Sequence, residues 1–175
     1  MDYGIANSIG RPPSIEIENI IDTAIKNDIW FYDTAKSYGY SEKALGIVFS
    51  KMNINDKVKC ITKLDPNFTF KSFNSLKKTV QKSLDHLNIN YLWGLLLHRP
   101  KIYGNWNQFL KSIEHLKNIK LIKNFGVSVY TPEEAMCFAV NKYIDVIQVP
   151  FNAMDRRLID NNFFEVAREN NKKVL

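Results

Sequence analysis

Residues 29–42 read I-W-F-Y-D-T-A-K-S-Y-G-Y-S-E and contain, in order, a strand, a polar loop and the beginning of a helix. Ile29 to Tyr32 is a short run of β-branched and aromatic residues, which favours a strand. Asp33 follows it directly, and apolar residues at helical spacing continue from Ser41 to Lys51. The stretch therefore has the form of one βα unit, with a polar side chain where the strand ends.

The same unit recurs along the whole chain. Strands are expected at residues 29–32, 58–62, 91–97, 124–129 and 145–149, and residues 173–175 begin another. Helices are expected at residues 14–25, 41–51, 71–87, 105–118, 131–140 and 158–170, with Ser14 and Thr131 as N-caps. Strands that alternate with helices indicate an α/β fold with a parallel sheet. No glycine-rich GxGxxG turn follows a strand, so a (β/α) barrel of the TIM type is favoured over a Rossmann fold.

The composition is typical of a globular protein without a membrane or nucleic-acid partner. The 175 residues are 45% hydrophobic, and the longest apolar run, residues 91–97, is far shorter than the roughly 20 residues of a spanning helix. Lysine and arginine give a net charge of +6 but are scattered, which does not favour nucleic-acid binding. Residues 1–15 lack the pattern of a signal peptide. We therefore expect a cytoplasmic protein with a single domain over residues 1–175, and Cys60 and Cys137 as reduced, buried thiols.

Polar residues stand where successive predicted strands end. Their spacing is roughly one βα unit, about 30 residues, and they are Asp33, Lys63, His98, Ser128 and Gln148. Barrel enzymes build their active sites at this end of the strands, so all five side chains are expected at one mouth. Tyr38, in the loop after Asp33, can reach the same opening.

These residues belong to motifs that resemble the aldo-keto reductase family. Residues 33–42 match its signature D-T-A-x-x-Y-G-x-S-E, and further matches are Thr62-Lys63, the L-L-H-x-P of residues 96–100, Gly126-Val127-Ser128 and the Q-V-P-F-N of residues 148–152. The matches come in the family's order and cover nearly the whole chain.

The resemblance implies a carbonyl reduction that needs a hydride at carbon and a proton at oxygen. Tyr38 is implied as the general acid, and Lys63 as the cation that favours its ionised form. Asp33 would hold Lys63, and His98 would donate a hydrogen bond to the carbonyl oxygen.

The same resemblance implies a nicotinamide cofactor, NADPH or NADH, and a small-molecule carbonyl substrate, with no metal. Ser128 and Gln148 would hold the carboxamide of the nicotinamide, with Asn152 close by. Residues 2–7 look like the opening loop of bacterial members linked to surface-sugar synthesis, which suggests a sugar-like carbonyl.

The length departs from the family's pattern. A complete (β/α)₈ barrel takes roughly 250 residues, so we expect a partial barrel, truncated at both ends, that holds the family's strands two to six and the start of the seventh. Val129 and Gly94 stand where many relatives carry Asn and Asp. The loops that bind the cofactor phosphates normally follow strands seven and eight, so we expect the 175-residue chain to bind NADPH weakly or not at all and to be inactive on its own.

Two interpretations remain open at this point. The first is a partial chain of a reductase, and the second is a non-catalytic partial barrel that serves as a binding or assembly module. In both, exposed strand edges are expected to cause self-association.

Overall fold

The computed structural model describes residues 12–100 and 105–175, and its centre is a sheet of six parallel strands. The strands are β1 (Phe31–Asp33), β2 (Lys59–Leu64), β3 (Leu92–Leu97), β4 (Ile122–Ser128), β5 (Val146–Gln148) and β6 (Lys173–Val174). The helices are α1 (Ser14–Lys26), α2 (Ser41–Lys51), α3 (Phe73–Leu87), α4 (Trp106–Asn118), α5 (Pro132–Ala139), α6 (Arg157–Asp160) and α7 (Phe163–Glu169). Each strand lies beside the next one in the chain, as βα units predict.

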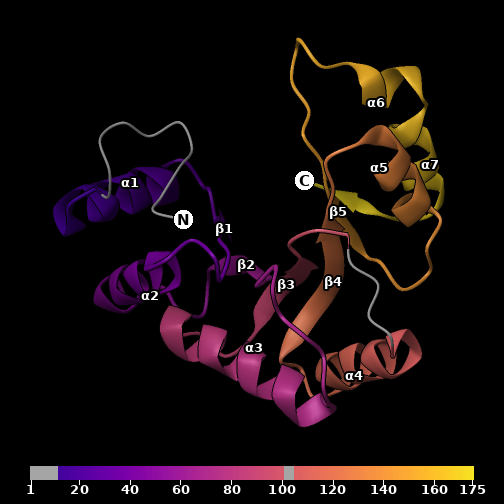
Figure 1. Cartoon of the computed structure of the whole chain (residues 1–175). Coiled ribbons are helices and arrows are strands. Elements are labelled where there is room, and N and C mark those ends of the chain that lie inside the picture. Colours follow the sequence, from indigo (N-terminus) through magenta and orange to yellow (C-terminus); the bar gives the residue numbers. More distant parts are fainter. Residues whose placement is uncertain (1–11, 101–104) are drawn as a thin grey trace.

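The sheet curls into half of a barrel. Figure 1 shows α2, α3 and α4 following one another along its outer side. Within the described residues β1 pairs only with β2, and β6 pairs only with β5. The predicted partial (β/α) barrel is therefore confirmed.

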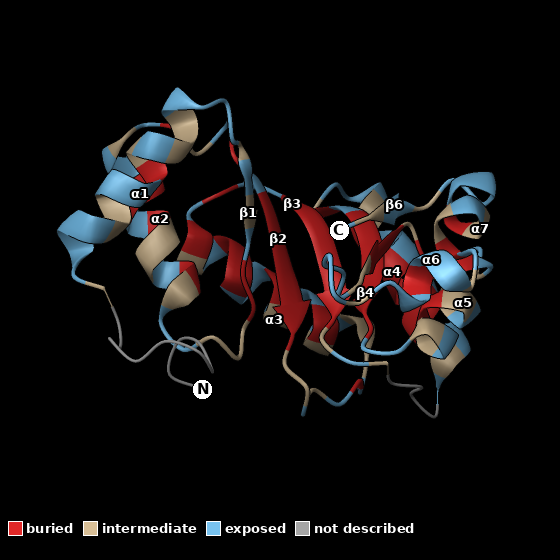
Figure 2. Cartoon of the chain, turned by 90° about the horizontal axis from the view of Figure 1, so that it is seen from above, coloured by how far each residue is buried: buried red, intermediate tan, exposed pale blue. Residues whose placement is uncertain are grey.

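The main core lies between the sheet and the helices. β3 is buried along its whole length, and three of its leucines, Leu92, Leu95 and Leu97, pack in one cluster with helix residues such as Leu76 and Phe109. Figure 2 shows this burial along β2 and β3. A second, smaller cluster contains strand residues only and lies on the concave side of the sheet; its members are Ile61, Trp93, Leu96 and Val146.

A residue with a left-handed backbone follows each of α1, α2, α3, α4 and α7. These residues have φ between 53° and 59°, and they are Asp28, Asn53, Asn88, Lys120 and Asn171. Such a residue stops the helix and turns the chain toward the next strand. Asparagine and aspartate tolerate this conformation better than other residues with a Cβ, so most of these helix ends use one of the two.

The single helix expected over residues 158–170 is wrong. α6 ends at Asp160 and α7 begins at Phe163, because Asn162 between them has φ 65° and cannot continue an α-helix.

Within the described ranges, no helix combines the length and apolar character needed to cross a membrane.

The two predicted N-caps have different outcomes. Thr131 caps α5 as predicted, because its side chain accepts a hydrogen bond from the Glu134 backbone. The N-cap predicted at Ser14 is wrong: α1 begins at Ser14, and the extended Pro13 precedes it.

The cysteines are both free thiols, but they differ in burial. Cys60 is buried as predicted, and this burial raises the pKa of its thiol to about 12. Cys137 is exposed on α5, so its predicted burial is wrong.

Candidate active site

The alternation of side chains along the strands sends the predicted site residues to one side of the sheet. Neighbours two apart on a strand share a face, so Lys63 lies on the face of Ile61 and Gln148 on the face of Val146. Ile61 and Val146 belong to the concave cluster. The polar residues at the strand ends therefore lie above an apolar floor, at the mouth of the half-barrel.

Asp33 and Lys63 form an ion pair at this mouth. Lys63 Nζ lies 2.7 Å from both Asp33 carboxylate oxygens and also donates to the Thr34 carbonyl at 3.1 Å. The Lys63 side chain is only 2% exposed, whereas that of Asp33 is 39% exposed. A buried ammonium needs such partners, so the pair fixes a positive charge at one point of the mouth.

Tyr38 and His98 lie beside this charge. Lys63 Nζ is 5.2 Å from the centre of the Tyr38 ring. The Tyr38 and His98 rings meet edge to face, with their centroids 5.7 Å apart. The structure thus brings together all four residues of the predicted catalytic set.

The surroundings of His98 favour its neutral form. Burial is the main cause that lowers the pKa of its imidazole, and the cations of Lys63 and Arg99 lower it further, against the opposite effect of Asp33 and Asp65. His98 Nδ1 also lies 3.1 Å from Ser37 Oγ. A neutral imidazole carries one N–H, which can be donated to an oxygen.

Ser128 and Gln148 lie side by side on β4 and β5, in register with each other. Gln148 Nε2 donates a hydrogen bond to Asp33 Oδ2 at 3.1 Å. Two of the three predicted cofactor residues therefore adjoin the predicted catalytic set.

Asn152, the third predicted cofactor residue, makes its side-chain hydrogen bonds within its own turn. Its side-chain oxygen accepts hydrogen bonds from the backbone of Met154 at 2.8 Å and of Asp155 at 3.1 Å, within its own turn. In the described part of the chain no hydrogen bond joins it to Ser128 or Gln148.

The loop that carries Tyr38 is anchored by residues for which no catalytic or binding role was predicted. Thr34 donates to Ser41 at 2.9 Å, across the base of the loop. Lys36 reaches α3, where it donates to the Thr79 carbonyl at 3.1 Å and to the Ser83 hydroxyl at 3.3 Å. Burial lowers the pKa of this ammonium.

Glu42, the last residue of the signature, is almost fully buried and joins three elements. It accepts a hydrogen bond from Thr62 on β2 at 2.8 Å, and its other oxygen lies 3.3 Å from His86 Nδ1 on α3. Thr62 directly precedes Lys63, so Glu42 links the helix after the Tyr38 loop to the strand that carries Lys63. A glutamate at the start of a helix is also expected for its charge alone, near the positive helix end, so its contacts with Thr62 and His86 do not follow from the sequence.

Gly46 allows α2 to approach α3 closely. A Cβ built at Gly46 would lie 2.1 Å from the His86 carbonyl oxygen and 2.8 Å from the carbonyl carbon of Leu87. Only glycine permits this backbone contact, which fixes the position of α2 and therefore of the loop before it.

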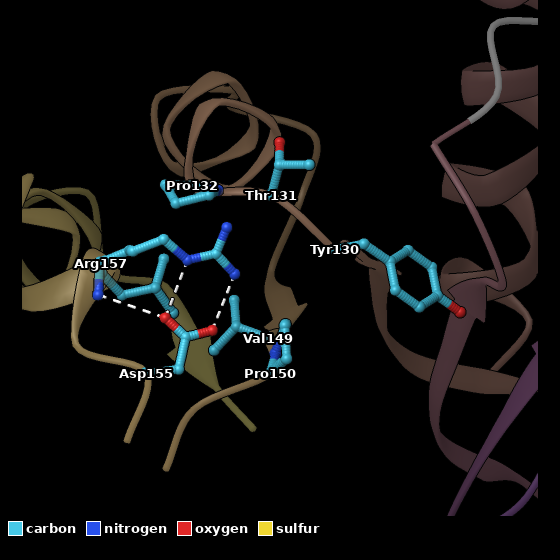
Figure 3. Close-up of a pocket in the computed structure, with 8 residues that line it drawn as sticks. Tyr130, Thr131, Pro132, Val149, Pro150, Asp155 and Arg157 are labelled. Carbon is cyan, nitrogen blue, oxygen red and sulfur yellow. Dashed lines mark hydrogen bonds and ion pairs between the residues drawn. The ribbon is translucent and has the colours of Figure 1, made fainter. Parts of the chain in front are cut away.

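A shallow hollow lies next to the mouth, between the ends of β4 and β5. Figure 3 shows Arg157 and Asp155 facing each other in it, while Tyr130 points away from them. Arg157 donates to the two Asp155 oxygens at 2.9 and 2.8 Å and holds the pKa of that carboxyl at about 2. The positive charge of Arg157 is thus paired with the Asp155 carboxylate of this chain.

Among the described residues, no group of His, Cys, Asp and Glu side chains could hold a metal ion.

Comparison with known proteins places this geometry in a family. The model of the Aldo/keto reductase family matches residues 2–175. D-arabinose 1-dehydrogenase of Saccharomyces cerevisiae is 32% identical over 131 residues, which are 69% of this chain and 38% of that protein.

Solved structures of aldo-keto reductases have the same fold. The enzyme AKR11C1 from Bacillus halodurans, in its holo form, gives a TM-score of 0.77 at 21% identity, over 93% of this chain and 57% of that one. An aldo/keto reductase from Klebsiella pneumoniae, solved with NADP and acetate, gives 0.74 at 20% identity, over 92% of this chain and 56% of that one. The chain thus spans less than two thirds of the length of each of these three proteins. Because the family model matches nearly every residue, the chain belongs to the aldo/keto reductase family.

Proposed function

We propose that this protein reduces an aldehyde or ketone with NADPH or NADH, and that Tyr38 supplies the proton. The observation that carries the proposal is the buried Lys63 ammonium, which holds both Asp33 oxygens and lies 5.2 Å from the Tyr38 ring. A cation close to a phenol favours its ionised form, so Tyr38 can release its proton to a carbonyl oxygen that becomes negative.

His98 has a complementary role in this proposal. Its ring lies against that of Tyr38, and its lowered pKa keeps it neutral near neutral pH. A neutral imidazole can orient the carbonyl by donating one hydrogen bond, without adding a second positive charge beside Lys63. Asp33 offsets the charge of Lys63 and keeps its ammonium in place.

Ser128 and Gln148 fit the carboxamide of a nicotinamide. Because Gln148 Nε2 already donates to Asp33, the amide oxygen of Gln148 is the atom available to accept from a carboxamide NH₂. The Ser128 hydroxyl, next to it in register, can serve the other end of the same group. A bound nicotinamide cofactor would supply the hydride for the carbonyl carbon. We leave Asn152 out of this set, because its oxygen is engaged in its own turn.

A sugar-like carbonyl is the proposed substrate class. The similarity to a protein named D-arabinose 1-dehydrogenase supports it, as does the resemblance of residues 2–7, which lie outside the described residues. The Klebsiella pneumoniae structure with NADP favours NADPH over NADH.

The test is NADPH oxidation with a panel of aldoses and simple aldehydes, followed by absorbance, for the purified chain and for its fusion to the last two βα units of a related aldo/keto reductase. We expect turnover by the fusion that depends on the carbonyl compound and is lost in Tyr38→Phe. If the fusion folds cooperatively and binds NADPH but oxidises none with any carbonyl compound, the reductase proposal is wrong, and the alternative of a non-catalytic binding or assembly module is favoured.

A further inference from the structure

Ser37 connects the Tyr38 loop to His98. It lies between β1 and α2, next to Tyr38 in the chain, and its Oγ is 3.1 Å from Nδ1 of His98, at the end of β3. This is a contact between a hydroxyl, which can donate or accept, and a ring nitrogen, which can do either according to its tautomer.

The neutral state of His98 makes the tautomer important. Burial and the cations of Lys63 and Arg99 disfavour the doubly protonated ring, so one nitrogen carries a hydrogen and the other a lone pair. The partner of one ring nitrogen decides which form is present. Either Nδ1 donates to Ser37 and Nε2 has a lone pair, or Ser37 donates to Nδ1 and Nε2 carries the hydrogen.

Only the second arrangement allows His98 to donate to a substrate. Ser37 occupies Nδ1, so a carbonyl oxygen at the mouth can receive a hydrogen bond only from Nε2. We propose that the Ser37 hydroxyl donates to Nδ1 of His98 and keeps the hydrogen on Nε2, which makes Ser37 a positioning residue for carbonyl reduction. This inference rests on the function proposed above and adds the source of the His98 tautomer.

The tautomer can be measured without turnover. In protein labelled with ¹⁵N-histidine, long-range proton–nitrogen spectra distinguish a ring nitrogen that carries a hydrogen from one that accepts. We expect the His98 Nε2 signal to be of the N–H type and the Nδ1 signal of the acceptor type. Ser37→Ala should give averaged signals from both tautomers, and Ser37→Thr, which keeps the hydroxyl, should restore the wild-type pattern.

A matched control is Ser112→Ala, which removes a serine hydroxyl that donates to the Gln108 carbonyl on α4. It should leave the His98 signals unchanged. Nδ1 carrying the hydrogen in the wild type, or an unchanged His98 pattern in Ser37→Ala, would overturn the proposal.

Turnover gives an independent second readout. Ser37→Ala should lower kcat by roughly tenfold or less, the effect of one ordinary hydrogen bond, with NADPH binding unchanged and Ser37→Thr close to wild type. An altered tautomer with unchanged kcat would overturn the positioning role. A protein with the expected tautomer that reduces no carbonyl would instead contradict the proposed function, and the two failures are thereby distinguished.

Discussion

Gln148 donates a hydrogen bond to Asp33 although the two residues are 115 positions apart in the chain. The contact joins the end of β5 to the end of β1 across the open side of the half-barrel. Asp33 therefore accepts from Lys63 and from Gln148 at once. The residue proposed to hold the cofactor thus shares a partner with the cation proposed to assist proton transfer.

Replacing Gln148 by Glu should make this contact repulsive. The new carboxylate would face the Asp33 carboxylate, and we expect a loss of about 1 kcal/mol or less in the free energy of unfolding, because the site is partly open to solvent. Salt should reduce the loss, since it screens exposed charges. Gln148→Met, which removes the contact without adding charge, is the control. Urea unfolding at low and high salt gives the measurement, and an equal loss at both concentrations would refute the repulsion.

The Tyr38→Phe variant tests the proposed proton donor. It removes only the hydroxyl, so we expect kcat to fall by ~10²–10⁴-fold while the dissociation constant for NADPH changes little. Tyr40→Phe is the matched control, because Tyr40 is in the same loop and is 40% exposed; it should retain activity. If Tyr38→Phe keeps most of its kcat, the proton comes from another group, and His98 is the next residue to test.

Gly46→Ala should destabilise the protein although alanine is the better helix former. The added Cβ meets the His86 carbonyl oxygen at 2.1 Å, and such overpacking typically costs about 1–3 kcal/mol. Gly94→Ala is the control, because its Cβ would meet Ile61 Cγ1 at an ordinary 3.4 Å. Thermal or urea unfolding compares the two. Equal stability of both variants would show that α2 can move away from α3.

The lowered pKa of His98 predicts a specific loss of stability in acid. Between this pKa and the ordinary value of 6.5, the unfolded chain binds more protons than the folded one, so the free energy of unfolding falls as the pH falls. His98→Asn should flatten the pH dependence in this window. Histidine NMR titration gives the pKa directly, and a midpoint above 6.5 would reverse the predicted sign.

Self-association should proceed through the edge of β1 that pairs with no other strand in the described part of the chain. Ile29, just before this strand, is 52% exposed, and an exposed apolar strand edge invites pairing with another chain. Ile29→Lys should shift sedimentation profiles toward the monomer. Ile15→Lys, with an isoleucine that is 62% exposed on α1, has the same charge change away from the edge and should not. If both variants behave alike, net charge rather than the β1 edge controls association.

The sequence predicted the fold and the end of the sheet where the candidate residues gather, because both depend on local patterns. The order of the strands follows from their alternation with helices, and Asp33, Lys63 and His98 could be placed because each ends an apolar strand. Tyr38 could be placed because its loop directly follows Asp33, and the motif match then implied its role.

Contacts between distant side chains could not be predicted in this way. The bond between Glu42 and Thr62, the reach of Lys36 to α3 and the bond between Gln148 and Asp33 depend on how helices pack on the sheet. The same limit applies to the split between α6 and α7, since an asparagine can lie within a helix at a small cost or end it, and only the backbone at Asn162 shows the break.

The left-handed residues after the helices show a structural role for several asparagines of this chain. Glycine is the usual residue at such positions, but the whole chain contains only seven glycines. Asn53, Asn88 and Asn171 act there instead. In a protein of this composition, an asparagine at the end of an amphipathic run marks the boundary between a helix and the turn to the next strand. Lysine can occupy such a position, as Lys120 does after α4, but asparagine adopts the left-handed conformation at a lower cost.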